Sequence, residues 1–184
     1  MTKAVQWKWI DHRPAKVNRF KLDNARIEYL TTEQIDRLLV SAREDQNMDV
    51  YPFIVIGLET SMRKSEILSM RLENIRLDQQ SIYIPQAKAG ARQQPITRHL
   101  AEFLKGYLDR AEDGQEWLFP TRKQSSKCGH ITSIEKAFSR VVERAGLDPK
   151  TVVRHTLRLT AITHLVQAGI DLPTVQRIRG HKTL

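Results

Sequence analysis

The feature that most constrains the fold is an apolar segment in the first half of the chain. Residues 50–75 read VYPFIVIGLETSMRKSEILSMRLENI, and this stretch holds no charged residue before Glu59. Because other elements must cover so apolar a helix on most sides, we expect it to be the central buried helix of the fold. Thr60 and Ser61 predict a turn, and a second helix is expected to run from there through Leu68 and Leu72.

Helical periodicity recurs on both sides of this segment. Thr31 followed by Gln34 has the spacing of a capping box and predicts the start of a helix. Pro173 suits a first helical turn, and Gly146 and Gly169 are expected to end two helices, because glycine readily adopts the left-handed conformation at a C-terminus. The later helices are predicted at residues 97–112, 132–145, 156–168 and 172–178.

One segment reads as a strand instead of a helix. Residues 81–85 (SIYIP) alternate, and Gly90 marks a turn after them. Residues 95–97 (PIT) are expected to return as the paired strand, which places Lys88 near the tip of the hairpin. The predicted fold class is therefore mainly α-helical with a small antiparallel β-hairpin, an α+β arrangement.

The positive charge of the chain lies at its two ends. The formal net charge is +9, of which residues 1–28 carry +4 and residues 150–184 carry +5. The middle, residues 29–149, has 17 basic and 17 acidic side chains. This segregation predicts contact with a polyanion such as a phosphate backbone, although a merely basic protein is an alternative.

Composition argues against two protein classes. No apolar run approaches the roughly 20 residues that a membrane span needs, and residues 1–10 have no secretory core. Cys128 is the only cysteine, which excludes a disulfide framework and a cysteine-based zinc site. We therefore expect a cytoplasmic protein with no membrane partner.

Two arginines have the sequence context of phosphate ligands. Attack on a phosphodiester places extra negative charge on its oxygens, and a guanidinium fork binds such oxygens at two points. Arg63 follows the predicted turn, and Glu66 could orient it, although an ordinary surface ion pair is the alternative. His155 and Arg158 are spaced to project from one face of a helix, where a capping or surface role is again possible.

Four such elements occur in one order along the chain: TSMRKSEI (60–67), the hairpin lysine, HTLR (155–158) and RGH (179–181). Together they resemble the motifs of the tyrosine recombinases, also called phage integrases. The resemblance covers residues 29–184, which would be the catalytic domain. Residues 1–28 would be a linker or the tail of a missing core-binding domain.

The resemblance implies metal-free site-specific recombination or integration of double-stranded DNA through a 3′-phosphotyrosyl intermediate, with no cofactor and with other protomers assembled on the DNA. Arg63 and Arg158 would bind the scissile phosphate, and Lys88 would protonate the departing 5′-oxygen. His155 would assist proton transfer at the nucleophile, and His181 would hydrogen-bond the phosphate.

The sequence also departs from the family pattern. The family's nucleophilic tyrosine follows the His181 element, and the chain printed here ends at Leu184. We therefore expect a C-terminally incomplete catalytic domain that binds DNA without cleaving it; a non-catalytic DNA-binding remnant of a prophage integrase is the alternative. Ser61, Thr156 and Leu159 replace the usual Gly, Asp and His, and Ser61 is expected to strain its turn if the turn needs a positive φ.

Other basic side chains are expected to contact DNA phosphates. Lys136, Arg140 and Arg144 recur at helical spacing among acidic residues, so an ordinary charged helix face is the alternative for them. The side chains expected to contact DNA are Lys64, Arg92, Lys123, Lys127, Arg140, Arg154, Arg179 and Lys182.

Residues 109–116 hold four acids that could bind the metal of a nuclease. A solvated acidic helix end is the favoured interpretation, so no metal site is expected. His164 is expected to be structural, because it lies well around the helix from Arg158.

Overall fold

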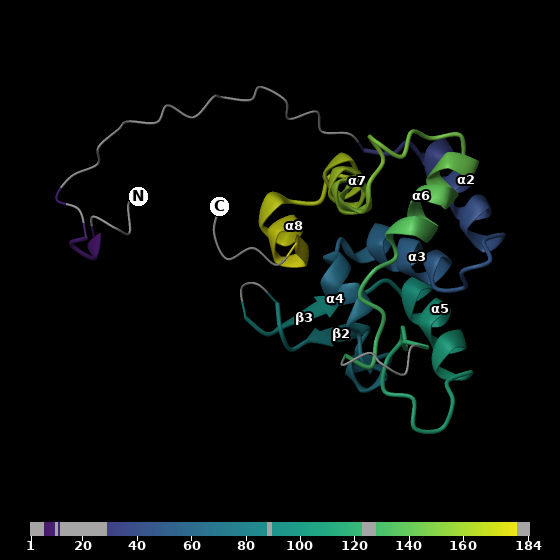
Figure 1. Cartoon of the computed structure of the whole chain (residues 1–184), viewed down its shortest axis with the longest axis horizontal. Helices are drawn as coiled ribbons and strands as arrows, with labels where there is room; N and C mark the ends of the chain where they lie inside the picture. The colour runs from purple at the N-terminus through teal and green to yellow at the C-terminus, as the bar shows by residue number, and fades with distance from the viewer. Residues whose placement is uncertain (1–5, 10, 12–28, 88–89, 123–127, 180–184) are drawn as a thin grey trace.

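The computed structural model describes residues 6–9, 11, 29–87, 90–122 and 128–179. Within these residues the chain forms a helical body with a small sheet at its edge, which confirms the predicted fold class (Figure 1). The elements are α2 (Thr32–Arg43), α3 (Val50–Thr60), α4 (Lys64–Leu68), the 3-10 helix η1 (Leu72–Asn74), β1 (Ile75–Arg76), β2 (Ser81–Ile84), β3 (Arg92–Pro95), α5 (Arg98–Leu108), α6 (Glu135–Arg144), α7 (Arg154–Gln167) and α8 (Leu172–Arg179).

The apolar segment forms α3, and this helix is the centre of the core, as predicted. Phe53, Ile54 and Ile56 are almost fully buried, and α2, α5 and α7 all pack against α3. Gly57 allows a close approach to α7, because a Cβ at this position would lie 3.1 Å from the Leu157 side chain. This tight contact brings the C-terminal end of α3 next to the start of α7.

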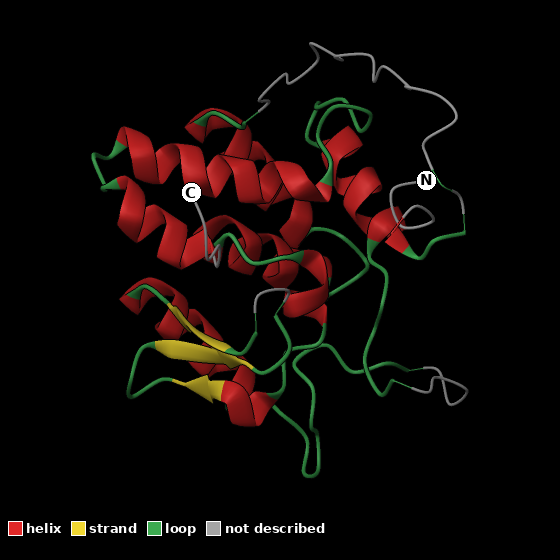
Figure 2. Ribbon diagram, turned by 90° about the vertical axis from the view of Figure 1, so that its left-hand side faces the viewer, coloured by secondary structure: helices red, strands yellow, loops and turns green. Residues whose placement is uncertain are grey.

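The sheet has the strand order β1-β2-β3 and is antiparallel throughout. It lies at one edge of the helical body (Figure 2). β2 and β3 pair from Ser81↔Pro95 to Ile84↔Arg92. The returning strand was predicted at residues 95–97, and this was wrong, because the strand begins three residues earlier, at Arg92, and ends at Pro95. The strand ends there because Thr97 caps α5, accepting the N–H of Leu100 at 3.0 Å.

The helix predicted to run through Leu72 ends at Leu68. After it, the backbone pairs with a distant segment: the Leu118 N–H donates to the Met70 carbonyl, and the Leu72 N–H donates to the Glu116 carbonyl, both at 2.9 Å. The carbonyl of Met70 and the N–H of Leu72 are thus engaged outside any helix. The sequence of α4 contains no sign of this pairing.

The start of the helical body is attached to α7. The Leu30 N–H donates to Thr160 Oγ1 at 2.9 Å, and His164 Nε2 lies 3.0 Å from the Leu30 carbonyl. His164 therefore has the structural role expected of it. Most of the predicted linker, residues 1–28, lies outside the described residues, so that boundary stays a prediction. Among the helices described, none is both long and apolar enough to cross a membrane.

Candidate functional site

Arg63 and Arg158, far apart in the sequence, line the same pocket. The pocket has a volume of about 200 Å³, and its lining comes from the turn after α3, the start of α4 and the first turn of α7. The lining residues are Met62, Arg63, Lys64, Arg154, His155 and Arg158. Such a cluster of cationic side chains is suited to binding a phosphate group.

The turn before Arg63 is stabilised by its own side chains. Thr60 Oγ1 donates to the Ile56 carbonyl at 2.6 Å and accepts the Met62 N–H at 3.2 Å. Between them, Ser61 adopts the left-handed conformation, with φ 53° and ψ 23°. The turn at Thr60 and Ser61 is therefore confirmed, and it does need a positive φ.

Replacing Ser61 with glycine is expected to stabilise the protein by about 1 kcal/mol. Glycine adopts the left-handed conformation without a Cβ penalty, and it removes the Ser61 hydroxyl, which is buried and has no hydrogen-bond partner among the described residues. Urea unfolding measures the gain. Gln80→Gly, at an exposed position with φ 44°, is the control for the backbone effect alone. A gain no larger than that of Gln80→Gly would show that the hydroxyl costs nothing, and an unchanged stability of Ser61→Gly would contradict the prediction.

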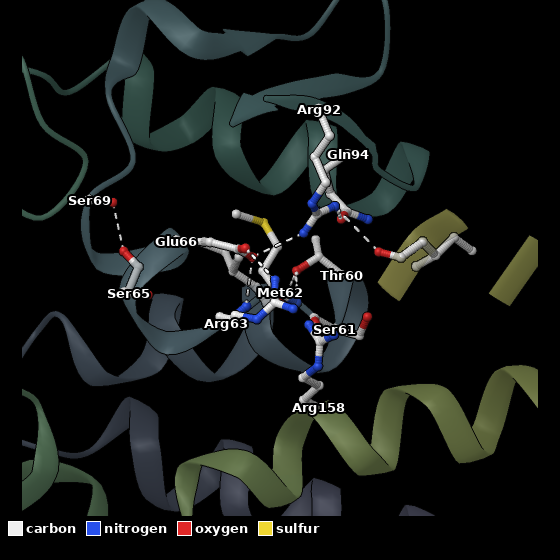
Figure 3. Close-up of polar contacts among 12 residues, drawn as sticks. Thr60, Ser61, Met62, Arg63, Ser65, Glu66, Ser69, Arg92, Gln94 and Arg158 are labelled. Carbon is white, nitrogen blue, oxygen red and sulfur yellow. Dashed lines mark hydrogen bonds and ion pairs between the residues drawn. The ribbon is translucent and has the colours of Figure 1, made fainter. Parts of the chain in front are cut away.

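Glu66 holds Arg63 in place. Its carboxylate accepts the Arg63 N–H at 3.0 Å and Arg63 Nη1 at 2.8 Å, and it also accepts Arg92 Nη2 at 3.0 Å (Figure 3). The predicted Arg63–Glu66 ion pair is confirmed, and it is no ordinary surface pair, because the Glu66 side chain is only 4% exposed. Burial acts to raise the pKa of Glu66, but the hydrogen bonds from Arg63 and the charges of Arg92 and Arg63 outweigh it and lower the pKa.

The first turn of α7 presents both His155 and Arg158 to the pocket. His155 is exposed, whereas Arg158 is only 4% exposed and its Nη1 donates to the Ser61 carbonyl. Thr156, one of the departures from the family pattern, has a local role here, because its hydroxyl accepts the Val153 N–H at 3.1 Å and so stabilises the helix start.

The role of a second carboxylate beside the pocket was missed by the sequence reasoning. Glu135, at the start of α6, lies 3.0 Å from Lys64 Nζ and 3.4 Å from Arg154 Nη2. Glu135 thereby links Lys64 and Arg154 at the rim of the pocket. Burial acts to raise the pKa of Glu135, but the hydrogen bond from Lys64 and the nearby Arg154 outweigh it and lower the pKa. No local pattern signals this contact, because the partners are distant in sequence.

Arg92 and Arg140, which are also expected to contact DNA, bind carboxylates within the fold. Arg92 is directed at Glu66, and Arg140 binds Asp45 through two hydrogen bonds of 2.8 and 2.6 Å. The hydrogen bond from Arg140 is the main cause of the lowered pKa of Asp45, whose side chain is buried. Arg144 also approaches Asp45, at 3.5 Å. These contacts join α6 to the end of α2; whether Arg140 also contacts DNA stays a prediction.

The other predicted site residues lie outside what the structure describes. These are Lys88, Lys123, Lys127, His181 and Lys182, together with the side chain of Arg179. Their roles stay predictions. In the described part of the chain, no group of three or more His, Cys, Asp or Glu residues could hold a metal ion.

The sequence model of the phage integrase family matches residues 28–184. The chain belongs to this family. A similar relative is the tyrosine recombinase XerA of Thermococcus kodakarensis, 25% identical over 177 residues, which are 95% of this chain and 61% of XerA. The phage integrase chain described here thus spans less than two thirds of that relative's length.

Solved structures show the same fold. A Tn1549 transposon integrase, in complex with a circular intermediate DNA, superimposes with a TM-score of 0.79 at 21% identity, covering 99% of this chain and 67% of that one. The catalytic domain of bacteriophage HP1 integrase superimposes with a TM-score of 0.62 at 24% identity, covering 84% and 81%. These integrases support the fold of the present chain.

Proposed function

We propose that this chain binds DNA as the phosphate-binding part of a site-specific recombinase that cleaves and rejoins strands without metal through a 3′-phosphotyrosyl intermediate. The observation that carries the proposal is the pocket shared by Arg63, His155 and Arg158. Two guanidiniums around one phosphorus centre stabilise the charge of a pentacovalent state, and each contact is worth about 3 kcal/mol by comparison with other oxyanion donors.

The remaining roles are assigned to residues in and beyond the pocket. His155 assists proton transfer at the nucleophile, Lys88 protonates the departing 5′-oxygen, and His181 hydrogen-bonds the phosphate. Lys64 and Arg154, at the rim, bind neighbouring phosphates once DNA competes with Glu135 for them. Arg140, Lys123, Lys127, Arg179 and Lys182 extend the contact along the backbone.

We infer that the nucleophile is none of the four tyrosines of this chain. Tyr29, Tyr51, Tyr83 and Tyr107 are all described, and none lines the pocket. The rings of Tyr51 on α3 and Tyr107 on α5 pack against the Phe103 ring, at centroid distances of 5.8 and 5.2 Å. By this inference the chain binds DNA but forms no covalent adduct from its own residues.

The proposed partners are double-stranded DNA and further recombinase protomers. The Tn1549 integrase complex with DNA supports the first of these by analogy of fold. The charge of +9, concentrated at the two ends of the chain, supports it independently. Location on DNA in the cytoplasm follows from the same proposal.

Binding of a labelled duplex at several salt concentrations tests the DNA-binding part of the proposal. Each neutralised phosphate contributes about −0.9 to the slope of log affinity against log salt, so one phosphate in the pocket and one at each of the two rim cations predict a slope of about −2.7. A nicked duplex incubated in EDTA tests the inference on the nucleophile, since we expect no covalent adduct. A slope near zero would contradict the first proposal, and an adduct on one of the four tyrosines would contradict the second.

A non-catalytic DNA-binding remnant is a second candidate, favoured by Ser61 in its strained turn. An activated phosphodiester with a 4-nitrophenyl leaving group separates the two, because it needs no protonation of the leaving oxygen. With hydrogen peroxide as external nucleophile and EDTA present, a recombinase pocket is expected to accelerate release of 4-nitrophenol. A remnant would bind DNA without any acceleration.

A further inference from the structure

Arg92 connects two elements that are far apart in the sequence. Its Nη2 donates to Glu66 Oε2 at 3.0 Å, and its Nη1 donates to the Ile178 carbonyl at 3.4 Å and to Gln94 Oε1. The side chain is only 12% exposed and is directed from β3 toward the turn that carries Arg63 (Figure 3). A side chain so placed has little surface left for DNA.

The contact with Ile178 lies at the C-terminal end of α8, which ends at Arg179. The last carbonyls of a helix have no partner within the helix, and they carry the negative end of its dipole. A guanidinium at this end therefore satisfies one of these carbonyls and is also favoured by the dipole. Arg92 thus acts as a cap for α8 supplied by the sheet.

The contact with Glu66 lies beside the phosphate pocket, because Glu66 also binds Arg63, which lines it. The same Oε2 atom accepts the Arg63 N–H and Arg92 Nη2, both at 3.0 Å. Burial lowers the pKa of Arg92 from its ordinary value, and the charge of Glu66 offsets part of this effect, so the guanidinium remains charged. The ion pair between Arg92 and Glu66 therefore contacts both Arg63 and α8 and sets their positions.

We propose that Arg92 is a positioning residue that holds the C-terminal end of α8 against the start of α4, where Glu66 binds Arg63. In the sequence, Lys88 shortly precedes Arg92, and His181 shortly follows α8. Arg92 accordingly lies where the chain segments leading to three predicted catalytic residues meet. Its effect on phosphate binding rests on the proposed function, whereas its effect on α8 does not. This role replaces the direct DNA contact first expected for Arg92.

Arg92→Lys and Arg92→Gln test the proposal. Lysine keeps the charge but lacks the planar fork that reaches both partners, so both variants are expected to lose the connection. Amide hydrogen exchange of the DNA-free protein is expected to accelerate about 10-fold or more in α8 and in α4, with α2 and α6 unchanged. Duplex affinity is expected to fall about 10-fold in both variants.

Arg98→Lys is the matched control, because the Arg98 side chain on α5 is 85% exposed, and no change is expected from it. Unchanged exchange in α8 of both Arg92 variants would overturn the proposal. Faster exchange in every helix would also overturn it, since Arg92 would then only stabilise the whole fold. Wild-type affinity of Arg92→Lys with a loss in Arg92→Gln would instead identify a simple charge contact with DNA. If the wild-type chain does not bind DNA, the proposed function fails, and hydrogen exchange still decides the role of Arg92.

Discussion

An Arg158→Ala variant is expected to bind duplex DNA about 10- to 100-fold more weakly than the wild-type chain at the same salt concentration. Arg158 is only 4% exposed, and its hydrogen bond to the Ser61 carbonyl holds the guanidinium at the pocket before any phosphate binds. Alanine removes a pocket cation that can make charge-assisted hydrogen bonds to phosphate. Fluorescence anisotropy with a labelled duplex measures the loss.

Two further variants make this result specific. Arg98→Ala removes the same charge from an 85% exposed side chain and is expected to change affinity less than about twofold. Arg158→Lys keeps the charge without the planar fork and is expected to recover only a small part of the affinity. Circular dichroism and unfolding midpoints establish which variants are folded. A folded Arg158→Ala or Arg158→Lys protein with wild-type affinity would show that the pocket does not bind phosphate.

Replacing Glu66 with glutamine is expected to destabilise the protein by about 3 kcal/mol at neutral pH, because it leaves the mostly buried Arg92 without its counter-ion. The difference depends on pH. The pKa of Glu66 in the folded state is lowered from its ordinary value of 4.5, so its contribution is present above pH 4.5 and is lost as the pH falls through the folded pKa. Wild type and variant are therefore expected to converge in stability in acid.

Urea unfolding at a series of pH values measures both effects of Glu66→Gln. Glu102→Gln is the control, because the Glu102 side chain is 66% exposed in its pair with Arg98, and little change is expected from it. Equal stabilities of wild type and Glu66→Gln at neutral pH would contradict the role given to Glu66. A gap that persists unchanged in acid would show that the carboxylate charge is not its cause.

Much of the helical structure was predictable because its signals are local. Thr31 and Gln34 do form a capping box, and Gly146 and Gly169 follow their helices with positive φ. The segment from Val50 to Thr60 is buried on nearly all sides because it has almost no polar side chain to expose. Each of these features depends on residues within one or two helical turns.

Boundaries set by contacts between distant segments were not predictable in the same way. The helix α4 ends where residues 70–72 pair with residues 116–118, and β3 ends where the Thr97 cap begins α5. The roles of Glu135 and Asp45 were missed for the same reason. When a carboxylate binds a partner that is distant in the chain, no fixed spacing in the sequence indicates the contact.

The sequence by itself determined the order of the helices, the turn at Thr60 and Ser61 and the local pairing of Arg63 with Glu66, since hydrogen bonds and packing between near neighbours decide them. Only the tertiary structure decided that Arg63 and Arg158 share a pocket and that Arg92 is directed inward to α8 and Glu66. The physical reason is the close packing of α3 on α7 at Gly57 and the position of β3, from which Arg92 reaches Glu66 on α4. These contacts bring together charged groups whose order in the chain says nothing of their distance in space.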